Sequence, residues 1–107
     1  MKYHLYLKKM QNNFLIGIPT FNEEKSILNV LKQIQSFVSE NDEKNCRYEV
    51  VFYDDGSTDN TVKIIQENSS FNVIVGKTNK GLGHAMKNLF QYELGNWTSE
   101  TESLRND

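Results

Sequence analysis

The sequence YEVVFYDDGSTD, residues 48–59, carries the clearest structural signal in this 107-residue chain. Its first half is rich in β-branched and aromatic residues, which predicts a strand. Its second half supplies a glycine, hydroxyls and acids suited to a tight turn before a helix. Two adjacent acids, Asp54 and Asp55, stand where the strand ends. A carboxylate at the end of a buried strand is costly unless something there uses its charge, so this pair points to a function.

Strands of the same kind are expected on both sides of this stretch. Phe14–Ile18 (FLIGI) is an almost wholly apolar run closed by Pro19, as is typical of a strand buried on both faces. Phe71–Val75 (FNVIV) is the third predicted strand.

An amphipathic helix is expected after each strand, because apolar residues recur there at helical spacing. The apolar positions of the first helix run from Ile27 to Val38, and the other two helices are predicted over Asn60–Glu67 and from Ala85 to about Leu94. We expect Asn22 to cap the first helix, with Glu23 and Glu24 in its first turn. The alternating order predicts an α/β fold, a partial Rossmann-like parallel sheet built from three βα units.

Composition and charge narrow the function classes. The formal net charge of −2 gives no global positive field, so nucleic acid is not an expected partner. Cys46 is the only cysteine, which excludes an internal disulfide and favours the cytoplasm. No apolar run is long enough for a transmembrane helix, so attachment at the inner face of a membrane would have to be peripheral. We expect one domain over residues 14–97, a leader of uncertain structure over 1–13, and a polar tail over 98–107 that frays.

Ligands of such sheets bind at the carboxyl ends of the strands, which places three loops together: Pro19–Glu24, Asp54–Asp59 and Gly76–Gly83. Turn chemistry and helix capping explain the second loop except for its doubled acid. We therefore expect Asp55 to face the crevice, where a carboxylate can accept the imide N–H of a uracil or guanine ring.

The other two loops each allow a functional and a purely structural interpretation. Phe21 is suited to form the floor of a base or ribose pocket, or else joins the core; Glu23 contacts a ribose, or else only begins a helix. The third loop fits neither a Walker A nor a dinucleotide fingerprint. It is a basic segment before a helix N-terminus, suited to a diphosphate, although an exposed lysine-rich turn explains each lysine equally well.

The three loops together resemble those of family 2 glycosyltransferases of the GT-A type, in the branch similar to dolichyl-phosphate-mannose synthase. The matching residues are Ile18–Glu23, Tyr48–Val51 with Asp54–Thr61, and Asn79–Ala85, and the likeness extends from Phe14 to about Trp97. The resemblance implies transfer of a sugar from a UDP- or GDP-sugar, usually with Mg²⁺ or Mn²⁺ bridging the diphosphate.

The resemblance also implies a role for each matching residue. Pro19, Phe21 and Glu23 would line the base and ribose, and Asp55 would hydrogen-bond the base. Asp54 would brace the turn, and Lys80 would lie near the phosphates. The expected nucleotide-sugar-binding residues are therefore Pro19, Thr20, Phe21, Glu23, Asp54, Asp55 and Lys80.

The chain departs from the family pattern after Trp97. A fourth apolar strand ending in an Asp-x-Asp metal motif is expected there, but Thr98–Ser103 is polar, so we expect a chain truncated before that strand. The metal ligands, general base and acceptor site would then be absent, with no catalytic residue to name. Glu100 and Glu102 alternate like a metal pair, but without the strand nothing would aim them.

A missing fourth strand has consequences for assembly. It would leave Phe14–Ile18 as an unpaired apolar edge, so we expect a homo-oligomer, a dependence on a missing C-terminal half, or poor solubility. A non-catalytic nucleotide-binding or regulatory module acting with a partner chain is the alternative function. A receiver-like domain would place the acidic pair after its first strand, which does not fit this chain.

Overall fold

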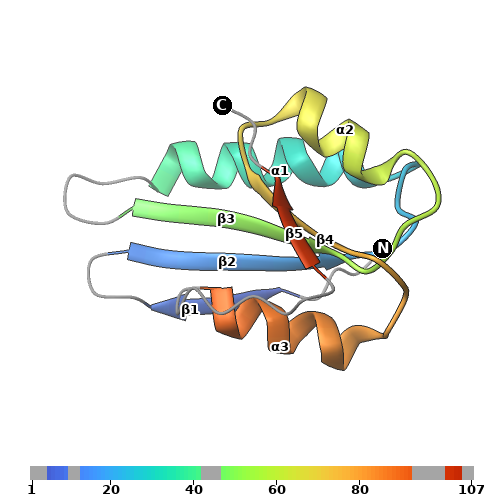
Figure 1. Cartoon of the computed structure of the whole chain (residues 1–107). Helices are drawn as coiled ribbons and strands as arrows, with labels where there is room; N and C mark the ends of the chain where they lie inside the picture. The colour runs from blue at the N-terminus through green and yellow to red at the C-terminus, as the bar shows by residue number, and fades with distance from the viewer. Residues whose placement is uncertain (1–4, 10–12, 42–46, 93–100, 105–107) are drawn as a thin grey trace.

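The computed structural model describes residues 5–9, 13–41, 47–92 and 101–104. The elements in chain order are β1 (Tyr6–Lys9), β2 (Asn13–Thr20), α1 (Ile27–Asn41), β3 (Arg47–Asp54), α2 (Thr61–Asn68), β4 (Asn72–Gly76), α3 (Leu82–Tyr92) and β5 (Thr101–Leu104). The described strands form one sheet in the order β1-β2-β3-β4-β5 (Figure 1).

The centre of the sheet is parallel, and its longest pairing joins β2 to β3. These two strands run side by side in register from Asn13↔Arg47 to Thr20↔Asp54, and β4 continues the parallel order from Val51↔Asn72 to Asp54↔Val75. The predicted α/β fold with three successive βα units is therefore confirmed.

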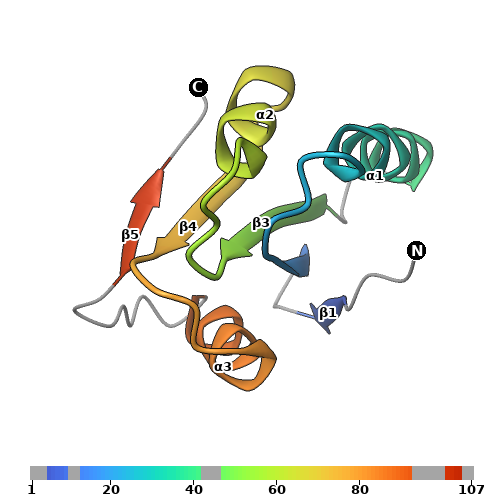
Figure 2. The same ribbon diagram turned by 90° about the vertical axis from the view of Figure 1, so that its right-hand side faces the viewer.

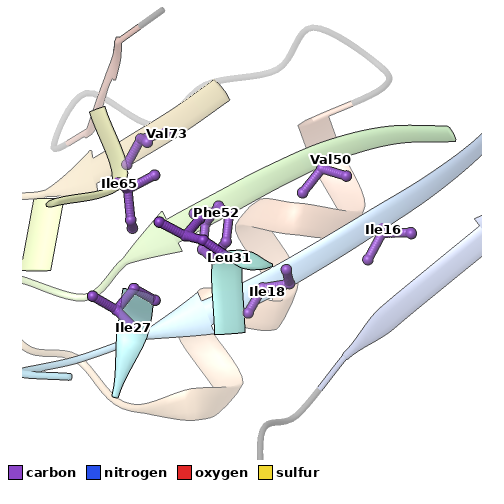
Figure 3. Packing of buried hydrophobic residues seen from close by; sticks show 8 residues of the cluster. All are labelled: Ile16, Ile18, Ile27, Leu31, Val50, Phe52, Ile65 and Val73. Carbon is purple, nitrogen blue, oxygen red and sulfur yellow. The ribbon is translucent and has the colours of Figure 1, made fainter. Parts of the chain in front are cut away.

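Helices cover both faces of this sheet, with α1 and α2 on one face and α3 on the other (Figure 2). Under α1 and α2 lies the larger core, shown in Figure 3 and made of Ile16, Ile18, Ile27, Leu31, Val50, Phe52, Ile65 and Val73. Under α3 lies a second core of Leu15, Val51, Tyr53, Ile74, Ala85 and Leu89. Because β2 and β3 supply side chains to both cores, they are buried on both faces, as their apolar sequences predict.

The outer edge of β2 is paired, so the prediction of an unpaired apolar edge is wrong. β1, within the predicted leader, runs antiparallel to β2 from Tyr6↔Gly17 to Lys9↔Phe14. The Tyr6 ring packs edge-on against Phe90 of α3, with ring centroids 6.3 Å apart. Backbone pairing with β2 and this ring contact hold a segment whose sequence is otherwise weak for a strand.

The tail also joins the sheet where its backbone is described. β5 runs antiparallel to β4 from Gly76↔Thr101 to Val73↔Leu104, so the prediction of a frayed tail is wrong for Thr101–Leu104. Strand pairing uses main-chain groups and requires no apolar run, so the polar sequence of this segment does not predict a strand. Residues 98–100 and 105–107 lie outside the described residues.

Two helix starts differ from the predicted ones. α1 begins at Ile27, so Asn22 lies too far upstream to cap it, and Glu23 and Glu24 precede its first turn. α3 begins at Leu82, three residues before the predicted Ala85, because the glycine-rich segment there is helical. The predicted end of that helix, about Leu94, lies outside the described residues.

Candidate functional site

The carboxyl ends of β2, β3 and β4 meet at one end of the molecule, at the right of Figure 1 and facing the viewer in Figure 2. The β2–α1, β3–α2 and β4–α3 loops gather there, as expected for parallel strands that share one direction. We call this end of the sheet, with its three loops, the rim.

Asp54 braces the turn that follows β3. Its side chain is fully buried, and its carboxylate accepts hydrogen bonds from the Ser57 backbone N–H at 2.8 Å and from the Ser57 hydroxyl. The Thr20 hydroxyl donates a third at 3.2 Å, which ties the end of β2 to the same carboxylate. Burial raises the pKa of Asp54 above its ordinary value of 3.8, and these hydrogen bonds offset only part of that rise.

Asp55 holds the third loop. Its residue is 5% exposed, and its two carboxylate oxygens accept the backbone N–H groups of Lys80 and Gly81 at 2.9 and 2.8 Å. Its own backbone N–H donates to the Thr20 carbonyl at 2.9 Å, which extends the pairing of β2 with β3. The carboxylate expected to face a base therefore also connects β3 to the start of α3.

Gly56 brings the second and third loops into contact. Its φ is +78°, a conformation that favours glycine. A Cβ built on Gly56 would lie 2.6 Å from the Thr78 carbonyl carbon and 2.8 Å from the Asn79 nitrogen. Since both neighbours are backbone atoms, the loops could not accommodate a side chain without moving apart.

Asn22 links the first loop to the second instead of capping a helix. Its φ is +50°, and its backbone N–H donates to the Ser57 hydroxyl at 2.8 Å. Its side-chain carbonyl accepts the Thr58 backbone N–H at 2.8 Å. Asn tolerates this left-handed backbone better than most residues, which explains its presence between β2 and α1.

A second set of hydrogen bonds joins the start of α2 to the first loop. The Thr61 hydroxyl accepts the Glu23 N–H at 2.8 Å, and Glu24 accepts the Asn60 N–H at 3.2 Å. Asp59 accepts the N–H groups of Thr61 at 2.9 Å and of Glu24 at 3.3 Å. Desolvation raises the pKa of Asp59, but the hydrogen bonds from Thr61 and Glu24 outweigh it and hold that pKa below 3.8.

The structure brings the predicted site residues to one rim. Phe21 is 39% exposed, so the alternative that places its ring in the core is wrong. It directly follows Thr20, whose carbonyl bonds the Asp55 backbone, so Phe21 and Asp55 share the same edge. Lys80 is exposed on the third loop, and Pro19 lies half-buried in register with Tyr53 of β3.

Other residues that build the rim were not predicted. Asn22 was expected to cap a helix and Thr61 had no predicted role, yet both bridge segments more than thirty residues apart. Only the register of β2 against β3 brings these segments together, and no local pattern encodes it.

Metal-ligating side chains do not gather at the rim in groups of three or more among the described residues. No group of three or more His, Cys, Asp or Glu side chains there could hold a metal ion. Asp54 at the end of β3 and Asp55 directly after it already accept hydrogen bonds from donors of the rim. Glu102 lies in β5 opposite Val75, and Glu100 lies outside the described residues, so their expected failure to act as a metal pair stays a prediction.

Comparison with known protein families fits this arrangement. The family model for glycosyl transferase family 2 matches residues 15–99, which include β2 from Leu15 onward, β3, β4 and all three rim loops. The chain belongs to that family. No described helix of this family 2 chain is long and apolar enough to cross a membrane.

Curated relatives share the same region. An uncharacterized protein of Methanocaldococcus jannaschii is 41% identical over 64% of this chain and 27% of its own length. Dolichyl-phosphate beta-glucosyltransferases of Saccharomyces cerevisiae and Dictyostelium discoideum are 36% and 31% identical, over 77% and 65% of this chain. The chain spans about a quarter of the length of these relatives, 24–27%. No solved structure gives a significant match.

The contact at Gly56 can be tested by substitution. Gly56→Ala should lower the free energy of unfolding by at least about 2 kcal/mol, because the new Cβ meets backbone and the residue keeps a positive φ. Gly83→Ala is the matched control: Gly83 lies in α3 with open space around it, so alanine should stabilise by roughly 0.4–1 kcal/mol. Urea unfolding measures both, and equal effects would contradict the loop contact.

Asp54 and Asp59, whose pKa values are shifted in opposite directions, should make the free energy of unfolding depend on pH in opposite ways. Because the pKa of Asp54 is raised in the folded state, wild type should lose stability relative to Asp54→Asn as pH rises above 3.8. Because the pKa of Asp59 is lowered, wild type should lose stability relative to Asp59→Asn as pH falls below 3.8. Urea unfolding between about pH 2.5 and 6 measures both differences. Trends of the same sign would show that one of these environments is misassigned.

Proposed function

We propose that the rim binds the nucleoside diphosphate of a UDP- or GDP-sugar, as the donor-binding part of a family 2 glycosyltransferase. The observation that carries this proposal is an exposed aromatic ring, Phe21, on the same sheet edge as the buried acid Asp55 and the basic loop around Lys80. An aromatic face, an acceptor and a cation are the three chemistries that a base, its N–H groups and a diphosphate require.

Each proposed contact is compatible with the bonds already made at the rim. Phe21 would stack against the base, and the half-buried Pro19 and Glu23 would border the ribose. Each oxygen of Asp55 accepts one backbone N–H and keeps a second lone pair for a base N–H. Thr20 and Asp54 are buried and bonded to each other, so their part is to support the pocket wall.

We propose further that the 107-residue chain does not complete sugar transfer alone. Family 2 enzymes generally rely on a divalent metal to offset charge on the leaving diphosphate, but the described residues offer no metal cluster. Two curated relatives are named for transfer of glucose to dolichyl phosphate.

Binding is tested by titrating the chain with UDP and with GDP while its amide resonances are recorded. One of the two should perturb the amides of Phe21 and Asp55. Phe21→Ala should weaken binding roughly 5- to 150-fold, because stacking of a base on an aromatic ring is worth about 1–3 kcal/mol.

Phe37→Ala is the control for that experiment, because Phe37 is similarly exposed, at 46%, but lies on α1 and contacts Tyr48 at the opposite end of the sheet. Its affinity should match wild type. If neither nucleotide at millimolar concentration shifts any rim amide, the chain does not bind the proposed ligand.

Activity is tested on the purified 107-residue chain with UDP- and GDP-sugars in the presence of Mg²⁺ or Mn²⁺. Release of nucleoside diphosphate should be undetectable, since no three His, Cys, Asp or Glu side chains among the described residues gather to hold the metal. Dolichyl phosphate is included as acceptor, and a dolichyl-phosphate beta-glucosyltransferase assayed in parallel serves as the positive control. Clear turnover by the 107-residue chain would show that residues outside the described ranges complete a centre.

A further inference from the structure

We propose that Asp55 is a positioning residue that fixes the third rim loop, so that recognition of the base and placement of the diphosphate depend on one carboxylate. This inference rests on the proposed nucleotide function and extends it. Asp55 would act on the diphosphate indirectly, through the backbone of Lys80 and Gly81, in addition to any contact it makes with a base.

The first argument is the number and geometry of the bonds. Both carboxylate oxygens of Asp55 accept backbone N–H groups of the third loop, at 2.9 and 2.8 Å, and the residue is 5% exposed. Hydrogen bonds to a charged acceptor are roughly twice as strong as neutral ones, and burial shields them from water. Loss of this acceptor would leave the two N–H groups without these bonds.

The second argument concerns charge at the start of α3. This helix has no acidic residue in its first turn, although a negative charge there is favourable. Asp55 supplies that charge from β3, since Gly81 immediately precedes the helix. The Lys80 and Gly81 N–H groups are therefore already bound to an internal anion, and a diphosphate would be held by lysine side chains of the loop instead.

The third argument is that the loop is held at two adjacent points of the same strand end. Gly56, the next residue after Asp55, lies against the Thr78 and Asn79 backbone, and Asp55 bonds the Lys80 and Gly81 backbone. Gly81 itself has a φ of +94°, which glycine adopts readily, so the chain can turn there from the bonded loop into α3. The distance from the base subsite to Lys80 is thereby set by β3.

The first test needs no ligand. Hydrogen exchange of the Lys80 and Gly81 amides is measured in wild type, Asp55→Asn and Asp59→Asn. An Asn side chain offers one carbonyl oxygen, so at least one of the two amides should exchange ten-fold faster or more in Asp55→Asn. Asp59→Asn removes a rim carboxylate that bonds Glu24 of the first loop and Thr61 at the start of α2, so it should leave both amides unchanged.

Amides of β3 and α1 report global stability in the same experiment and should keep their protection in Asp55→Asn. Unchanged protection of Lys80 and Gly81 in that variant would overturn the positioning role. Equal acceleration in both variants would overturn it too, because the effect would then be one of stability alone.

The second test separates positioning from base contact, using the nucleotide that binds and its nucleoside, UDP with uridine or GDP with guanosine. If Asp55 only contacts the base, Asp55→Asn weakens both ligands by the same factor. If Asp55 also positions the loop, Asp55→Asn should weaken binding of the nucleoside diphosphate at least five-fold more than binding of the nucleoside. Lys80→Ala should then cost less in the Asp55→Asn background than in wild type.

Equal losses for nucleotide and nucleoside, with additive effects of the two substitutions, would overturn the coupling. A wild-type chain that binds neither ligand would refute the proposed nucleotide function, and the exchange measurement would still decide whether Asp55 fixes the loop.

Discussion

The rim depends on two adjacent carboxylates at the end of β3, of which one accepts hydrogen bonds from the side of β2 and the other from the β4–α3 loop. Successive side chains of a strand point to opposite faces, so Asp54 and Asp55 at its end serve different loops. Asp54 accepts donors from Thr20 and Ser57, and Asp55 accepts donors from Lys80 and Gly81. Either charge, if buried without donors, would cost several kcal/mol, so each acid requires its loop to take one conformation. The doubled acid thereby connects β2, β3 and the start of α3.

This arrangement explains how a rim made of loops can be stiff. Backbone N–H groups of all three loops donate to side chains of another loop, so each loop is held by groups outside itself. The loops are already ordered when the protein has folded, so binding of a ligand to this surface loses less conformational entropy. The same arrangement makes the rim sensitive to substitution, because removing an acceptor in one loop leaves donors of another loop without their hydrogen bonds.

The sequence predicts the centre of the molecule well and its periphery poorly, for physical reasons. Strands β2 and β3 are buried on both faces and therefore need continuous apolar sequences. The helices that cover them carry apolar residues at helical spacing. Both patterns can be recognised in the sequence, so three βα units are predicted correctly. β1 and β5 are edge strands held by main-chain pairing, which leaves little trace in side chains. At the rim the residue types of Phe21 and Asp55 were informative, but the bonds from Asp55 to Lys80 and Gly81 span 25 and 26 positions and follow only from the assembled sheet.

Pro19 lies on β2 beside the rim, beyond the described pairing with β1. The Thr20 carbonyl points toward β3, where it accepts the Asp55 N–H, so the backbone of the preceding residue faces the other way. On that side the described pairing of β1 toward the rim ends at Gly17. Because proline has no N–H, no donor is left unsatisfied there, and a further strand finds a poor partner. The residue that discourages pairing at this edge is adjacent to Thr20, whose hydroxyl and carbonyl bond the two acids of the rim.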